Sequence, residues 1–277
     1  MSFWQIIKAL IALVTGHRRY TKSMGQLRTY SLQSNAIEAV LDAYRRGDYR
    51  AALDAAQSMK DNPQLAASYF FFSGIMLMNL GRFQEAEQLL RRHLTAAPDD
   101  KRAALANSSL GHLLVELERY DEAMDCFQAS LRHWPNRGSA HRDIAEACLR
   151  RGGPVSEAFN WAQLAVQEDR ARDNPTGSPQ VQEVCDINLA EDLATLAWAV
   201  AAGSRDRAQV DRLVDQAVSL VGTSASPAAL VRCHAGLAYR SLGDAAKSDE
   251  HFREAIRIDP NGLRGRSARA LTTSVNA

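Results

Sequence analysis

One spacing of residues recurs in three segments of this chain and constrains how each can fold. A glycine is followed by a small residue after 12 positions, by a large apolar residue after 16 and by a proline after 24. The three sets are Gly74, Ala86, Leu90 and Pro98; Gly111, Ala123, Phe127 and Pro135; and Gly236, Ser248, Phe252 and Pro260. Small residues let two helices approach closely, and proline cannot continue a helix. The spacing therefore predicts repeated pairs of helices.

This pattern resembles the tetratricopeptide repeat, a helix-turn-helix unit of about 34 residues. The resemblance implies an all-α fold, a right-handed α-solenoid of about six hairpins with an N-terminal amphipathic helix and a C-terminal cap. Weaker copies of the pattern extend it along the chain. We expect an N-terminal helix and basic linker at 1–33, hairpins 1 to 4 at 34–169, a loop at 170–182, hairpins 5 and 6 at 183–260, and a cap or tail at 261–277.

Composition and charge narrow the class of protein. The chain is 46% hydrophobic and 23% charged, which is typical of a soluble folded protein. Its net charge of +1 is unevenly distributed: residues 1–28 carry +5 and 261–277 carry +3, so 29–260 carry 1 − 5 − 3 = −7. An acidic body with basic ends disfavours nucleic acid as a partner. The four cysteines have no metal-ligand spacing, which favours a reducing, cytoplasmic location.

The family resemblance also implies a binding surface. In this family the first helix of each hairpin lines a concave groove that holds a peptide or protein partner. We expect a groove that is apolar at its N-terminal end and charged toward the fourth hairpin. The apolar positions would either anchor a peptide or pack against the N-terminal helix or a neighbouring subunit. Carried over position by position, the groove residues are Ile37, Leu41, Tyr44, Phe71, Ile75, Met78, Asn79, His112, Glu116, Arg142, Glu146 and Arg150.

The N-terminal segment differs from the repeats. Apolar residues recur at three- and four-residue steps between Phe3 and Val14, which predicts an amphipathic helix. Its 12 residues would extend about 18 Å, too short for a hydrocarbon core of about 30 Å. It would dock either on the array or a partner, or at an anionic membrane surface, with peripheral rather than spanning contact. The candidate membrane-contact residues are Phe3, Trp4, Ile7, Leu10, Arg18 and Arg19.

The sequence offers no catalytic pattern. It contains no nucleophile elbow, no phosphate-binding glycine motif and no paired histidines with metal-ligand spacing. His112 and Glu116 are four residues apart on one expected helix, a spacing that predicts a surface hydrogen bond between them. We therefore expect no enzyme activity, no cofactor and no metal.

The predicted function is a non-enzymatic scaffold or adaptor that binds a protein or peptide in its groove. The alternative is a structural subunit that forms homo-oligomers or docks on a membrane through its N-terminal helix.

Overall fold

The computed structural model describes residues 24–62, 65–97, 99–135, 138–171 and 179–273. Within these ranges the chain forms thirteen helices and no strand, so the all-α prediction is confirmed. The predicted amphipathic helix near the N-terminus lies outside the described residues.

Twelve of the helices pair as six hairpins, as the repeat pattern predicts. The first helix of each hairpin is α2 (Met24–Arg45), α4 (Ala66–Asn79), α6 (Asp100–Glu116), α8 (Gly138–Arg151), α10 (Pro179–Ala202) or α12 (Ala225–Leu242). The second is α3 (Tyr49–Gln57), α5 (Phe83–Thr95), α7 (Tyr120–His133), α9 (Val155–Arg170), α11 (Arg207–Leu220) or α13 (Ala245–Ile258). Helix α14 (Leu263–Thr273) follows the last hairpin.

Two helices begin earlier than the sequence pattern indicates. Helix α2 begins at Met24, inside the stretch expected to be a linker, and α10 begins at Pro179, inside the stretch 170–182 expected to be a loop. Proline fits the first turn of a helix because that position has no intrahelical partner for an N–H group. At α10 the proline therefore begins a helix, although it would have interrupted one elsewhere.

The spacing of 16 residues marks a contact between the two helices of a hairpin. A Cβ atom added to Gly111 would lie 2.4 Å from the ring of Phe127, and one added to Gly236 would lie 2.5 Å from the ring of Phe252. Both rings are fully buried. The glycine therefore makes room for the large side chain that seals the hairpin.

The turn inside each hairpin requires a left-handed residue. Glycine supplies it in most hairpins, for example Gly47 with φ 73° and Gly243 with φ 82°. In the third and fifth hairpins the left-handed residues are Glu118, with φ 58°, and Arg205, with φ 57°. Such conformations cost non-glycine residues free energy, so packing of the flanking helices must hold them.

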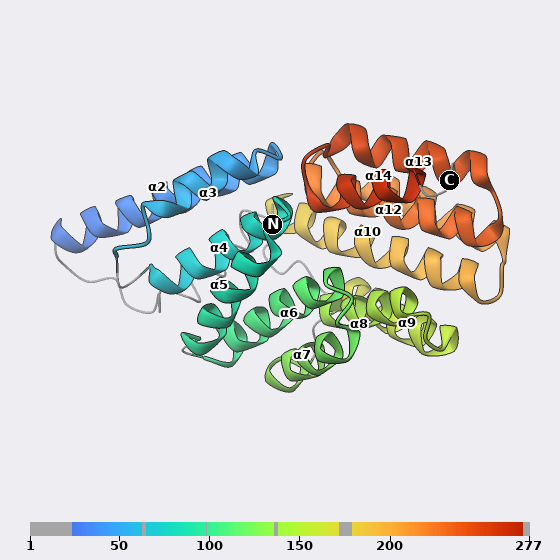
Figure 1. Cartoon of the computed structure of the whole chain (residues 1–277), viewed down its shortest axis with the longest axis horizontal. Coiled ribbons are helices and arrows are strands. Elements are labelled where there is room, and N and C mark those ends of the chain that lie inside the picture. The colour runs from blue at the N-terminus through green and yellow to red at the C-terminus, as the bar shows by residue number, and fades with distance from the viewer. Residues whose placement is uncertain (1–23, 63–64, 98, 136–137, 172–178, 274–277) are drawn as a thin grey trace.

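The superhelix curls so that its last hairpin returns to the first (Figure 1). At this meeting point the hydroxyl of Tyr49 donates a 2.7 Å hydrogen bond to Asp259. Helix α14 packs on α12 and α13, where Ala268 shares a buried cluster with Cys233 and Phe252. The C-terminal helix thus covers the last hairpin, and its first turn lies on the inner wall of the curl.

Replacing Gly111 with alanine tests the contact behind the recurring spacing. The methyl group would overlap the Phe127 ring, so we expect Gly111→Ala to lower the free energy of unfolding by about 1–3 kcal/mol. Adding Phe127→Leu provides space, so urea denaturation of the double variant should show a smaller loss than the sum of the two single losses. Strict additivity would contradict the contact.

Candidate functional site: the concave surface and its occupant

The C-terminal part of the chain crosses the concave surface. We call residues 259–266 the closing segment. The backbone N–H of Leu263 donates a 3.3 Å hydrogen bond to the side-chain oxygen of Asn79, and the Leu263 side chain joins the buried cluster that contains Met78. The guanidinium group of Arg266 donates to the carbonyl oxygens of Asn79 and Met78. These contacts attach the end of the chain to α4, at the apolar end of the surface.

The closing segment folds tightly around Asp259. Its buried carboxylate accepts hydrogen bonds from the Tyr49 hydroxyl and, at 3.0 Å, from the backbone N–H of Gly262. Burial raises the pKa of Asp259. Cβ atoms added to Gly262 and Gly265 would lie 1.9 and 1.8 Å from atoms of Asp259. Both positions therefore need glycine for the segment to take this path.

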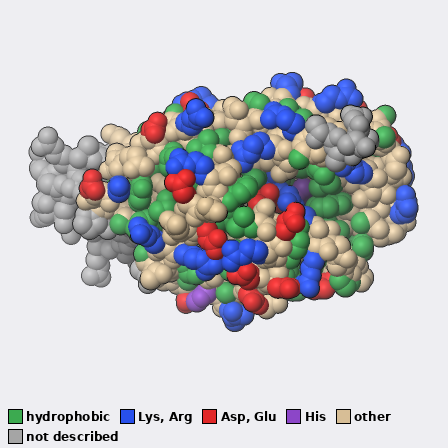
Figure 2. Space-filling model, in the orientation of Figure 1, with side chains coloured by type: hydrophobic (Ala, Val, Ile, Leu, Met, Phe, Trp, Pro, Cys, Tyr) green, Lys and Arg blue, Asp and Glu red, His purple; other side chains and the backbone are tan. Residues whose placement is uncertain are grey.

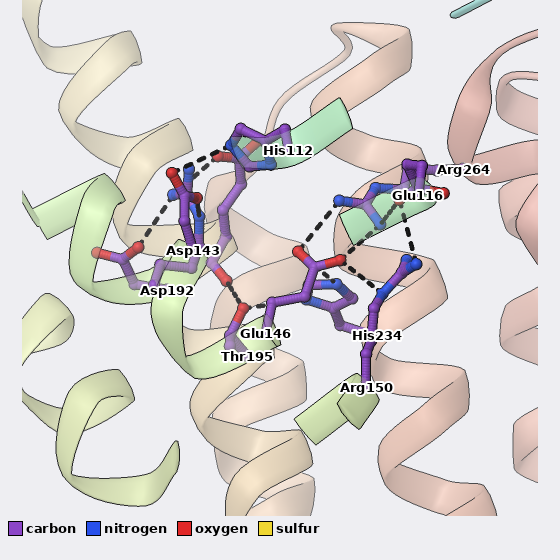
Figure 3. A network of polar contacts seen from close by, with 11 residues as sticks. His112, Glu116, Asp143, Glu146, Arg150, Asp192, Thr195, His234 and Arg264 are labelled. Carbon is purple, nitrogen blue, oxygen red and sulfur yellow. Dashed lines mark hydrogen bonds and ion pairs between the residues drawn. The ribbon is translucent and has the colours of Figure 1, made fainter. Parts of the chain in front are cut away.

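Arg264 extends from the closing segment into a group of acids on the inner wall (Figure 3). Its guanidinium donates to the two carboxylate oxygens of Glu146 at 2.7 and 3.1 Å and lies 3.5 Å from Glu116. Arg150 contacts the same two acids, Glu146 at 2.9 Å and Glu116 at 3.1 Å. The result is an alternating cluster of two arginines and two glutamates, which we call the four-charge cluster.

The four-charge cluster is shielded from solvent, so its pairing matters energetically. Arg264 is 6% exposed and Glu146 is 3% exposed. Burial alone would raise the pKa of Glu146, but the guanidinium groups of Arg264 and Arg150 hold it well below its ordinary range. Burial would lower the pKa of Arg264, and the carboxylates of Glu146 and Glu116 raise it instead. Both groups are therefore charged at neutral pH.

His234 supports Glu146 from the neighbouring α12. It is fully buried; one ring nitrogen lies 3.0 Å from the Thr195 hydroxyl and the other 3.5 Å from the Glu146 carboxylate. Burial lowers the pKa of His234, although Glu146 opposes this shift. A neutral histidine at this position fills the space beside Glu146 without adding a buried charge.

A second polar cluster joins α8 to α10. Arg142 lies 2.9 Å from Glu191 and 3.0 Å from Asp192, and all three are largely buried. Burial raises the pKa of Asp192 well above its ordinary value, and the nearby acids Asp169 and Glu191 add to this while Arg142 opposes it. Arg142 thus holds two consecutive hairpins together in the middle of the solenoid.

His112 and Asp143 connect this cluster to α6. The His112 ring lies 3.1 Å from Asp143, which also accepts a 3.2 Å hydrogen bond from the hydroxyl of Ser108. Glu116, one turn beyond His112 on the same helix, contacts Arg150 and Arg264 instead. The prediction that His112 and Glu116 pair with each other was wrong, because each faces a different residue across the groove.

The apolar residues assigned to the groove require a correction. Ile37 and Leu41 are 1% exposed and lie in a cluster with Tyr49 and Phe72, so they form part of the core between hairpins. The first helix of a hairpin must pack against its own partner as well as line the groove, and these two positions serve the packing.

The other apolar positions are covered to different degrees. Phe71 and Ile75 are half-buried, and the Phe71 ring lies 5.3 Å from that of His93 on α5. Tyr44 is hydrogen-bonded to Ser226 of α12, and burial raises its pKa to about 12. Among the residues assigned to the apolar end of the groove, Met78 and Asn79 lie directly against the closing segment.

The charged residues assigned to the groove lie in these two polar clusters, where Arg264 of the chain itself pairs with Glu116 and Glu146. Sequence patterns alone did not identify Arg264 and His234 in the four-charge cluster and around it, or Asp143 and Asp192 in the second polar cluster. The one available signal was charge, since the acid-free stretch 261–277 follows an acidic body. In Figure 2, Lys and Arg side chains are frequent over α12–α14, and both signs of charge are mixed over α6–α9.

Two further sequence predictions concern sites of other kinds. Among the described residues there is no group of three or more His, Cys, Asp or Glu side chains arranged to hold a metal ion. Nor does the described part of the chain contain a helix of the length and apolar character needed to cross a membrane. The proposed membrane-contact residues Phe3, Trp4, Ile7, Leu10, Arg18 and Arg19 lie outside the described residues.

Neutralising Glu146 tests the four-charge cluster. Glu146→Gln leaves Arg264 and Arg150 short of a buried partner, so we expect it to lower the free energy of unfolding at pH 7 by about 3–5 kcal/mol. Since the folded pKa lies below the ordinary 4.5, the stabilisation from Glu146 is complete above that pH and disappears as the pH falls through the folded pKa. The difference between wild type and variant in chemical denaturation should therefore shrink in acid.

An exposed ion pair provides the control for that comparison. Glu85 pairs with Arg82 at 2.6 Å, with both side chains about half exposed. Glu85→Gln should change stability little at either pH, because exposed pairs are screened by solvent. An equal effect of the two substitutions would contradict a special role for Glu146.

Comparison with known proteins agrees with this fold. The curated protein O-mannosyl-transferase Tmtc1 of Drosophila melanogaster is 32% identical over 89 residues, which is 31% of this chain and 10% of that protein. The chain thus spans about a tenth of this relative's length. A thermophilic TPR protein of Thermus thermophilus superposes with a TM-score of 0.52 at 17% identity, over 75% of this chain and 97% of that one. The pilF protein of Pseudomonas aeruginosa gives 0.48 at 14% identity, over 87% and 97%.

The family itself is identified from the sequence. Family models described as tetratricopeptide repeat match residues 37–101, 109–175 and 229–261. These ranges contain the three segments with the recurring spacing and three members of the four-charge cluster, Glu116, Glu146 and Arg150. The chain belongs to the tetratricopeptide repeat family.

Proposed function

We propose that this protein is a non-enzymatic interaction scaffold whose concave surface binds an arginine-bearing segment of a partner protein, in exchange for its own closing segment. Tetratricopeptide repeats build protein-interaction scaffolds, and that coarser assignment follows from the family. The observation that carries the finer proposal is the seating of Arg264 between Glu116 and Glu146.

The chemistry of the wall favours arginine over other side chains. Glu146 offers both carboxylate oxygens to one guanidinium group, a two-bond arrangement that a lysine ammonium cannot reproduce. An apolar residue just before the arginine fits as well, because Leu263 fills the cluster around Met78. A suitable partner segment therefore carries an apolar residue followed by arginine.

The closing segment would lower the apparent affinity of such a partner. A partner must displace Arg264 before its own arginine can reach Glu146, so only the fraction of molecules with an open groove can bind. The scaffold would then respond to partners that offer more contacts than residues 259–266 provide. The closing segment would thus make the groove selective for partners that bind more strongly than it does, with the same residues in the groove wall.

The proposal is tested with a peptide of known chemistry. A synthetic peptide with the sequence of residues 259–271 serves as the arginine-bearing probe. Arg264→Glu places a carboxylate beside Glu116 and Glu146, which should expel the closing segment and open the groove. Fluorescence anisotropy of the labelled peptide should then show affinity about tenfold or more above that of wild type, in which the groove is occupied.

A double variant provides the matched control. In Glu146→Gln with Arg264→Glu the closing segment still meets the repulsion of Glu116, but the wall lacks the carboxylate that pairs with arginine, so the arginine-bearing peptide should bind no better than it binds wild type. A peptide with glutamate in place of its first arginine should not bind the Arg264→Glu variant. If that variant binds the original peptide no better than wild type does, the groove is not an arginine-binding site.

A further inference from the structure

A cavity, distinct from the groove, lies where the two ends of the solenoid meet. It has a volume of about 670 Å³ and lies between the turn of the first hairpin and the C-terminal residues. Four arginines line it: Arg46 and Arg50 from the first hairpin, and Arg266 and Arg269 from α14. Asp48 is the one acid in this lining. These lining residues sum to a formal charge of 4 − 1 = +3, and the buried carboxylate of Asp259 lies next to them, hydrogen-bonded to Tyr49.

The acid of the lining, Asp48, is engaged by a helix end. The carboxylate of Asp48 caps α3 by accepting a 3.0 Å hydrogen bond from the backbone N–H of Ala51. Its role is therefore accounted for by the helix end. In the part of the chain that the structure describes, Arg46 and Arg50 are exposed and neither lies within 4.0 Å of a carboxylate oxygen.

The two arginines of α14 are held in place by backbone groups. Arg266 donates to the carbonyl oxygens of Asn79, Met78 and Asn261, and burial lowers its pKa. Arg269 donates a 3.3 Å hydrogen bond to the carbonyl of Pro260. Carbonyl oxygens orient these guanidinium groups, and the carboxylate of Asp259 raises the pKa of Arg266 against the effect of burial. The cavity therefore combines two positioned arginines with the exposed Arg46 and Arg50.

We propose that this cavity binds a small phosphate-bearing molecule. Guanidinium groups match phosphate oxygens in geometry and charge, and a volume of about 670 Å³ lies within the range of small-molecule sites. Two arginines come from each end of the chain, so one anion would contact both ends at once. Such a ligand stabilises the curled solenoid and protects α14 against opening.

Titration with pyrophosphate and ATP tests the site. Calorimetry at an ionic strength of about 0.15 M should show saturable binding of pyrophosphate to the wild-type chain, because nonspecific surface attraction is screened within about 8 Å. Arg46→Gln with Arg50→Gln should weaken binding about tenfold or more. Both residues are exposed, so the variant should fold as the wild type does.

A second pair of arginines gives a control with the same change in charge. Arg92 and Arg253 are exposed on α5 and α13 and do not line the cavity. Arg92→Gln with Arg253→Gln should leave pyrophosphate affinity unchanged. If both double variants lose affinity equally, general electrostatics explains the binding and the site is overturned.

The choice of probes identifies the chemistry of the ligand. Tighter binding of ATP than of pyrophosphate, with no binding of adenosine, indicates a nucleotide site; equal binding indicates recognition of the phosphate groups alone. Either result supports the proposal. Absence of saturable binding to both, or binding of a hexaglutamate peptide in their place, overturns it. The pyrophosphate titration uses the wild-type chain with its closing segment in place, and Arg264 and the groove acids do not line the cavity, so failure of one experiment does not decide the other.

Discussion

Arg264 and Glu146 are 118 positions apart in the sequence, and their buried contact joins the end of the chain to the middle of the solenoid. Removing a guanidinium group and a carboxylate from water is costly, so a buried pair persists only when both charges are fully satisfied. Glu116 and Arg150 complete the pairing, and His234 fills the adjoining space without adding charge. In most repeat arrays each unit contacts only its neighbours. Here the first and last hairpins also meet, through Tyr49 and Asp259.

This closure changes what the concave surface can do. An open groove would offer its acids to any cation, whereas under the proposed function a partner binds only in exchange for the closing segment. The same closure creates the arginine-lined cavity, because Arg266 and Arg269 reach Arg46 and Arg50 only when the ends meet. If the cavity binds an anion as proposed, that anion holds the two ends together and opposes the opening that a partner requires.

The parts of the fold that depend on nearby residues could be predicted from the sequence. The contact of Gly111 with Phe127 is local, and it produces a spacing that can be counted. The turns at Glu118 and Arg205 carry no such signal, because no glycine marks the left-handed position there. Packing of the flanking helices overrides the preference of a non-glycine residue for negative φ. The position of Arg264 could not be predicted, since it depends on the summed twist of six hairpins, and a small change per hairpin would move it away from Glu146.

The central claim is that residues 259–266 occupy the groove in the free protein. Amide hydrogen exchange at Leu263 tests it most directly, because this N–H donates to the side chain of Asn79 on a distant helix and not to its own helix. The account predicts protection comparable to that of α13 in the wild type, and fast exchange in Asn79→Ala. Exchange of the wild-type Leu263 amide at the rate of a free peptide would contradict the account.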